Sequence, residues 1–355
     1  MQITTNYRKL EGLSASNIKL FAKDRIAFYK EVVLKEKRKE KTSDALSLGT
    51  MIDFCLSDCL GSWQEFEQRF DEKFILLSVK KGSGQMFLLS DLLYEYTLRD
   101  MDEEENITSS FSERFEEAFL KLQEQDKFKG KKLEWALDQF KDSDAEIYFS
   151  ENLKAIDKIA IDQWMLDKGK TIVENTIYDE NIKYLFESNQ TNENLGKFVI
   201  QWNFQGYNAK SELDNLTINH KTKEIIITEI KSSWSIEDEG FARTYLKLRY
   251  DLAAIYYVEA VNSLFGSEYP DYKIKFQFLV VDTSPQGLKP LIYTLSENDL
   301  NKALNGFTTK SGYKYQGLQE LIDEIKWCEE NQEWYISKNA YENNSILPLS
   351  INYEI

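Results

Sequence analysis

Three strand-like segments follow one another between residues 197 and 231, and only short turns separate them. They are rich in β-branched and aromatic residues, which predicts strands that pair in sequence order. A helix and two more strands come next, with Ser235 and Ser296 expected to cap the helices that follow them. The order β-β-β-α-β-β predicts an α/β fold in which helices flank one mixed sheet. The expected elements are strands 197–202, 206–218 and 224–231, a helix over 240–265, and strands 272–283 and 288–295.

Helices are expected on both sides of this region in the sequence. Residues 1–195 are predicted to be mainly helical and to begin with helices over 13–33 and 46–60 that pack near the sheet. Residues 196–295 hold the core sheet and its helix, and residues 296–355 hold C-terminal helices and a tail. We therefore expect one integrated domain with a large helical N-terminal portion.

The chain has 355 residues, of which 42% are apolar, so it can bury a substantial core. No apolar run approaches the length of a membrane helix, and three cysteines do not suggest a disulfide framework. These features predict a soluble protein of the cytoplasm.

A single histidine, His220, limits the chemistry that is open to this chain. It lies between two strand-like segments and is expected in an exposed turn. A Ser-His-Asp triad or a zinc site built from several histidines would need His220 or further histidines. Glycine-rich phosphate loops are also absent from the sequence. An enzyme of this composition would depend on carboxylates, lysines and a bound metal ion.

The hairpin between the second and third strands offers such a site. If residues 220–223 form the turn, Asn219 pairs with Glu224 and Asp214 falls opposite Glu229, which brings two carboxylates together. A divalent cation between them would offset their repulsion, and hard oxygen ligands suit Mg²⁺ or Mn²⁺.

Two further groups complete this predicted site. The backbone carbonyl of Ile230 would add an oxygen ligand, and Lys231 would orient or deprotonate the nucleophile and stabilise charge on a scissile phosphate. The alternative is a solvated hairpin in which Glu229 and Lys231 form an ion pair on one face.

The pattern Asp-(turn)-Glu-x-Lys over two strands, followed by a helix, resembles the PD-(D/E)XK nuclease superfamily. Flanking segments follow the order found in RecE-type (exonuclease VIII-like) and RecB-type nuclease domains. These segments are 13–21, 47–56, Trp202 with Gly206, 209–214, 228–233 and 249–257, and near the end 327–334 and 346–349. Residues 61–195 match only loosely.

The resemblance implies a metal-dependent DNA nuclease, and its nearest relatives are 5′→3′ exonucleases that act on linear duplex DNA in phage-type recombination. It implies that Asp214 and Glu229 bind Mg²⁺ (or Mn²⁺) and that Lys231 is the catalytic lysine. The expected partners are DNA, a single-strand annealing recombination protein and other copies of the chain, in a bacterial or phage-infected cell. The alternatives are a catalytically inactive DNA-binding or scaffold protein with a nuclease fold, and a related endonuclease.

Departures from the family pattern affect other residues. Asp53 stands where the family often has a histidine, and it is either a further metal ligand or a helix residue with a local polar partner. The glutamine usual in the helix motif is replaced by Ala253. Three cysteines are too few for an iron–sulfur cluster, so none is expected, and Cys55 and Cys59 are expected to be buried.

Arg249 and Tyr257, on the helix after the hairpin, are expected to contact nucleic acid. A formal net charge of −16 argues against DNA binding, although a groove needs positive potential only locally. Basic clusters occur at 35–41 and 127–132, with further lysines near 302–314.

Overall fold

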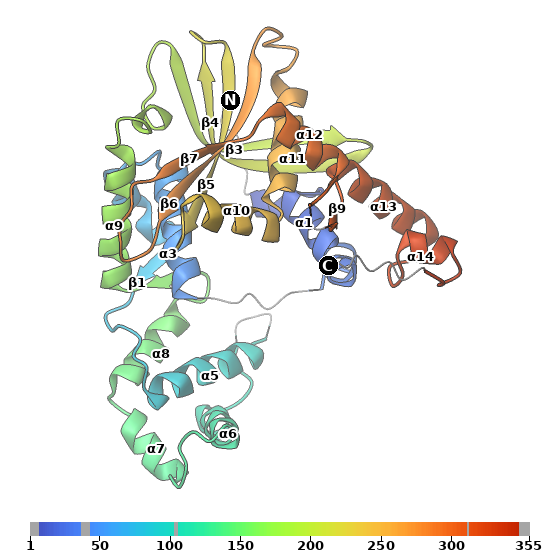
Figure 1. Ribbon diagram of the computed structural model, residues 1–355. Coiled ribbons are helices and arrows are strands. Elements are labelled where there is room, and N and C mark those ends of the chain that lie inside the picture. Colours follow the sequence, from blue (N-terminus) through green and yellow to red (C-terminus); the bar gives the residue numbers. More distant parts are fainter. Residues whose placement is uncertain (1–6, 37–42, 103–105, 311, 348–355) are drawn as a thin grey trace. The chain divides into compact units, whose positions relative to one another are not determined.

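The five strands at the centre of the chain pair into one mixed sheet in the order β3-β4-β5-β6-β7, shown in Figure 1. The β3–β4, β4–β5 and β6–β7 pairs are antiparallel, and β5–β6 is parallel. This computed structural model describes residues 7–36, 43–102, 106–310 and 312–347, so parts of segments 35–41 and 346–349 lie outside the described residues. The strands are β3 (Asn192–Phe204), β4 (Tyr207–Asn219), β5 (Glu224–Ser233), β6 (Lys273–Asp282) and β7 (Leu291–Thr294).

The chain divides into two compact units. The first contains residues 1–41, 52–62 and 172–355, and the second contains residues 42–51 and 63–171. Residues 52–62 and 172–195 belong to the same unit as the sheet, and the expected boundaries at residues 195 and 295 stay a prediction. Two helices, α3 (Asp44–Asp53) and α9 (Gln163–Ile177), have residues in both units.

The second unit is mainly helical, as expected, but it also contains a short parallel strand pair. Its buried core is formed by Leu, Phe and Ala side chains of α5, α6, α7 and α8. Its remaining elements are α4 (Trp63–Arg69), β1 (Phe74–Leu76), α5 (Gln85–Arg99), α6 (Phe111–Glu124), α7 (Leu133–Phe140), α8 (Asp144–Lys154) and β2 (Ile159–Ile161).

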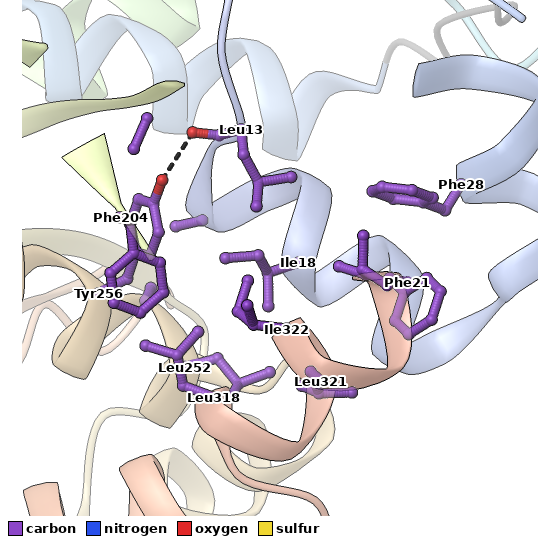
Figure 2. Close-up of a cluster of buried hydrophobic side chains, with 14 of the residues drawn as sticks. Leu13, Ile18, Phe21, Phe28, Phe204, Leu252, Tyr256, Leu318, Leu321 and Ile322 are labelled. Carbon is purple, nitrogen blue, oxygen red and sulfur yellow. Dashed lines mark hydrogen bonds between the residues drawn. The ribbon is translucent and has the colours of Figure 1, made fainter. Parts of the chain in front are cut away.

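Helices of the first unit surround one buried cluster that joins the two ends of the chain, shown in Figure 2. Side chains of α1, α11 and α13 meet there, among them Ile18, Leu252 and Leu321. The Tyr256 hydroxyl donates a 2.6 Å hydrogen bond to the carbonyl of Leu13 inside this cluster. The helices are α1 (Ala15–Lys23), α2 (Arg25–Phe28), α10 (Asp238–Lys247), α11 (Tyr250–Phe265), α12 (Glu297–Asn305), α13 (Leu318–Asn331) and α14 (Lys338–Glu342).

A second cluster lies between the sheet and helices α10 and α11. Ile225 and Ile227 of β5 and Phe276 and Phe278 of β6 contribute to it, together with Ala254 of α11. The burial of these apolar side chains fixes the strand register, because a shift by one residue would turn them to the opposite face of the sheet.

Two predicted helices are interrupted. The helix expected over 13–33 stops at Asp24, whose extended backbone ends α1 and whose side chain accepts from the N–H of Ala27 to cap α2. The helix expected over 240–265 breaks at Arg249, which has a left-handed backbone (φ 52°) and precedes α11.

The two predicted caps had different outcomes. Ser296 caps α12, as predicted, through a capping box with Asp299. The prediction for Ser235 is wrong, because Glu237 is the residue before α10 and Ser235 lies outside the helix. Between them the apolar Ile236 is in the core, where it is 1% exposed.

None of the helices in the described part of the chain is long and apolar enough to cross a membrane. His220 lies in an exposed turn, as predicted, and Cys55 and Cys59 are buried, as predicted.

Candidate functional site

Asp214 on β4 and Glu229 on β5 lie just past the end of the ladder that joins these two strands. The register predicted from the turn is confirmed, because Asn219 pairs with Glu224 and the ladder continues in step along the strands. The ladder ends at Asn215 and Thr228, and Asp214 and Glu229 are the residues next to this last pair. The predicted pairing of Asp214 with Glu229 is not part of the ladder, but the two acids lie close enough for the charge of Asp214 to act on Glu229. Their exposed fractions are 7% and 8%, so the fold buries two neighbouring carboxylates.

The backbone is irregular where Asp214 lies. Leu213 and Leu216 contribute to the same buried cluster although they are three residues apart. In a regular strand, residues three apart face opposite sides. The facing residue of β3, Lys197, has a left-handed backbone (φ 40°) and is left out of the ladder between β3 and β4. The regular pleat is therefore interrupted at Asp214 in β4 and at Lys197 in β3.

The Asp214 carboxylate accepts two hydrogen bonds from neighbouring strands. The backbone N–H of Ile230 donates to one oxygen at 2.8 Å, and the Lys197 ammonium donates to the other at 2.7 Å. Burial alone would raise the pKa of Asp214, but the positive charges of Lys197 and Lys231 outweigh it and lower this pKa. Asp214 is therefore held as a carboxylate.

Glu229 has one partnered oxygen and one without a partner. The Lys231 ammonium donates to Oε1 at 2.7 Å, and also to the Ile230 carbonyl at 3.0 Å. The second oxygen, Oε2, is buried and has no hydrogen-bond partner among the described residues. Burial, and then the charge of Asp214, raise the pKa of Glu229 to about 7. Such an orphaned oxygen calls for a proton or a cation.

Lys231 is held in its charged form. Burial would lower its pKa, but the charges of Glu229 and Asp214 dominate and raise it. Its ammonium also lies 5.5 Å from the centre of the Tyr250 ring, within the range of a cation–π contact. The site therefore holds Lys231 as a fixed positive charge.

Asp53 reaches the same group of charges from α3. Its carboxylate accepts from the Lys197 ammonium at 2.9 Å and from the Ser57 hydroxyl at 2.8 Å. A π-helical turn, Phe54–Asp58, follows Asp53 directly. The local polar partner that we considered for Asp53 is thus present, and its role as a metal ligand stays a prediction.

Gly196 allows this segment to approach β3. A Cβ at position 196 would lie 1.9 Å from the backbone carbonyl oxygen of Ser57, which no side chain can tolerate. The absence of a side chain there lets the π-helical turn lie directly against the strand. Asp53 is thereby placed within reach of Lys197.

Two lysines at this site were not predicted. The sequence predicts Lys197 only as the first residue of a strand, and nothing in the sequence indicates its left-handed backbone. Lys19 of α1 lies 5.6 Å from the Tyr250 ring centre. Burial, and then the charge of Lys231, lower the pKa of Lys19. Lys19 falls within segment 13–21 of the family resemblance, which was the available signal.

The two predicted nucleic-acid contacts differ in their surroundings. Arg249 lies in the break between α10 and α11, where it pairs with Asp251 at 3.0 Å and donates to the Gln316 carbonyl at 2.5 Å. Its guanidinium is therefore engaged within the protein. Tyr257 is half-buried on α11, and its pKa is raised by burial and then by the charge of Glu229. Tyr257 thus lies within electrostatic reach of the acidic pair.

The donor set at the pair can be compared with the needs of a metal ion. No three Asp, Glu, His or Cys side chains converge on a metal-holding geometry within the ranges that the structure describes. Lys197 and Lys231 instead hold the acids. The pair nevertheless offers carboxylate oxygens of Asp214 and Glu229 and the Ile230 carbonyl, with one buried oxygen lacking a partner. These oxygen ligands fit a hard divalent cation, which would replace the ammonium group of Lys197 or Lys231.

Comparison of this chain with protein-family models and with curated proteins gave no match. The family resemblance therefore rests on the residues described above.

Proposed function

We propose that this protein is a metal-dependent DNA nuclease of the PD-(D/E)XK type, acting as a 5′→3′ exonuclease on linear duplex DNA. The observation that supports this most directly is the buried pair Asp214 and Glu229, which lie next to the last paired residues of adjacent strands, with Lys231 beside Glu229. Neighbouring buried carboxylates repel each other, so a fold that keeps them together needs positive charge between them.

Asp214, Glu229 and the carbonyl of Ile230 would hold the ion, and Asp53 would supply a further oxygen. Mg²⁺ is the first candidate and Mn²⁺ the second, since both prefer oxygen ligands. When bound, such an ion supplies Lewis-acid stabilisation of the charge that develops on a scissile phosphate.

The protein groups around the pair have complementary roles in this proposal. Lys231 keeps its proton because its pKa is raised, so it serves as a fixed positive charge beside the reacting phosphate. Glu229, with a pKa raised to about 7, can release a proton near neutral pH and then present both oxygens to a cation.

A net charge of −16 argues against DNA binding, but the charges close to the site differ from this average. Three lysines, Lys19, Lys197 and Lys231, lie among the three acids Asp53, Asp214 and Glu229. These lysines offset the charges of the three acids, so a bound divalent cation would add positive charge to the site. A locally positive site can accept a phosphodiester although the whole chain carries −16.

A second candidate function is a DNA-binding or scaffold protein that keeps the nuclease fold without catalysis. One observation favours it, namely that Lys197 and Lys231 already partner Asp214 and Glu229. A permanently closed arrangement of this kind would bind no metal ion.

The test is incubation of the purified protein with linear and circular duplex DNA of the same sequence in Mg²⁺. An exonuclease removes only the linear form, and 5′- or 3′-end labels give the polarity. Loss of both forms would indicate an endonuclease. Intact DNA in Mg²⁺ and in Mn²⁺ would overturn the nuclease proposal and leave the scaffold function.

A further inference from the structure

The Lys197 ammonium lies between two carboxylates that come from different parts of the chain. It is 2.7 Å from Asp214 on β4 and 2.9 Å from Asp53 on α3. A single positive charge offsets only one of these two negative charges. A divalent cation in the same place would offset both, and carboxylate oxygens are its preferred ligands.

The position of Lys197 is built into the fold. Its left-handed backbone is unfavourable for a residue with a side chain, and such strain tends to occur at functional sites. The neighbouring Gly196 is required for the close approach of Ser57, and Ser57 in turn holds the second oxygen of Asp53. These features together aim the lysine and both acids at one point.

Access to this point is available from solvent. The Asp53 side chain is 29% exposed, whereas those of Lys197 and Asp214 are 18% and 10% exposed. An incoming ion would therefore meet Asp53 first. The long lysine side chain can move aside without a change in the strand that carries it.

We propose that Lys197 is a resident counter-ion that holds Asp53 and Asp214 together in the metal-free protein and is displaced when a divalent cation binds. This inference rests on the proposed metal-dependent function and assigns Lys197 a positioning role in it. Lys197 competes with the metal ion for the same oxygens. It thereby weakens metal binding and protects the acidic site from mutual repulsion when no ion is bound.

The test is direct measurement of Mn²⁺ binding, by electron paramagnetic resonance and calorimetry, for the full-length protein and the Lys197→Met variant. Removing the competing ammonium should lower the Kd by about tenfold or more, since an apparent Kd is the intrinsic value divided by the competent fraction. Lys275→Met is the matched control. Lys275 lies on the same sheet but pairs with Glu224, away from the acids of the proposed metal site.

A second readout is thermal stability in the presence of a chelator and after addition of Mn²⁺. Metal-free Lys197→Met should melt at a lower temperature than the wild type, and Mn²⁺ should raise its melting temperature more than that of the wild type. If the Met variant does not fold, Lys197→Gln keeps a polar side chain without the charge and takes its place.

Each outcome is decisive. A Kd that stays equal or rises in the variant, while the wild type binds Mn²⁺, overturns the role of Lys197 and leaves the nuclease proposal intact. Tighter binding by the variant without DNA cleavage by either protein supports the role of Lys197 and overturns the nuclease proposal. Absence of Mn²⁺ binding by both proteins overturns both.

Discussion

The backbone N–H of Ile230 donates a 2.8 Å hydrogen bond to the side-chain carboxylate of Asp214. This bond joins β4 to β5 just past the last paired residues of their ladder, one residue beyond Asn215 on β4 and two residues beyond Thr228 on β5. It anchors one acid of the pair to the strand that carries the other acid and the lysine. The irregular end of the strand pair thus becomes the place where charged groups gather.

Replacement of Lys231 by methionine should reduce DNA hydrolysis by about 100-fold or more, because a fixed positive charge beside the phosphate is lost. The fold should persist, since Glu229 can take up a proton when its partner is removed. Initial rates on end-labelled linear duplex and far-UV circular dichroism are the measurements. Lys275→Met, the control with an ion pair elsewhere on the sheet, should retain full activity.

The stability of the metal-free protein should depend on pH through Glu229. Its folded pKa of about 7 lies above the usual 4.5, so the folded state binds this proton more tightly. The resulting stabilisation is complete below about pH 4.5 and is lost as pH rises through about 7. The contribution of Asp214 to stability depends on pH in the opposite direction. Because its pKa is lowered in the folded protein, this contribution is lost as the solution becomes acidic.

Glu229→Gln isolates this effect, since glutamine imitates the protonated acid at every pH. The stability of the wild type relative to the variant should fall by about 1–3 kcal/mol between pH 5 and pH 8. Urea unfolding in the presence of a chelator measures it. If the stability difference between the wild type and the variant does not change with pH, the pKa of Glu229 is not raised in the folded protein.

Gly196→Ala should destabilise the protein by about 1–3 kcal/mol, because the new methyl group would overlap the Ser57 carbonyl oxygen. It should also move Asp53 away from Asp214, so that the ion loses one carboxylate ligand and Mn²⁺ binding weakens. Gly84→Ala is the comparison, since a Cβ there meets no atom within 4 Å. Equal unfolding midpoints for the two variants would contradict the close approach at position 196.

Tyr256→Phe should lower the free energy of unfolding by about 1 kcal/mol, which is what one buried hydrogen bond contributes. The ring keeps its packing in the cluster of Figure 2, and the Leu13 carbonyl keeps a second donor, the N–H of Lys210. Tyr335→Phe, at a side chain that is 69% exposed, should leave the unfolding midpoint unchanged. A larger loss at Tyr335 than at Tyr256 would be inconsistent with this packing.

Much of the fold could be predicted from the sequence, because strand periodicity and turn residues act locally. The Asn219–Glu224 pairing and the succession of five strands along the chain followed from them. The start of β3 at Asn192 did not, because residues up to 195 were expected to belong to the mainly helical part and the first strand was expected to begin at Lys197. Asn192 and Asn194 are buried there, and their side chains donate to backbone carbonyls that the sequence does not reveal as neighbours.

The site was predicted where it depends on strand register and was missed where it depends on distant contacts. Asp214, Glu229 and Lys231 follow from one hairpin. The contact between Lys197 and Asp53 joins positions 144 residues apart and needs both a left-handed backbone and the glycine beside it. Neither this contact nor the engagement of Arg249 by the carbonyl of Gln316 could be predicted from local pattern.

The central claim is that Asp214 and Glu229 share a divalent cation, and a crystal structure of the protein soaked in Mn²⁺ tests it most directly. Anomalous scattering should locate an ion within about 2.0–2.6 Å of oxygens from both side chains, with Lys197 moved away. An ion found elsewhere, or acids that still contact Lys197 and Lys231 at saturating Mn²⁺, would contradict the claim.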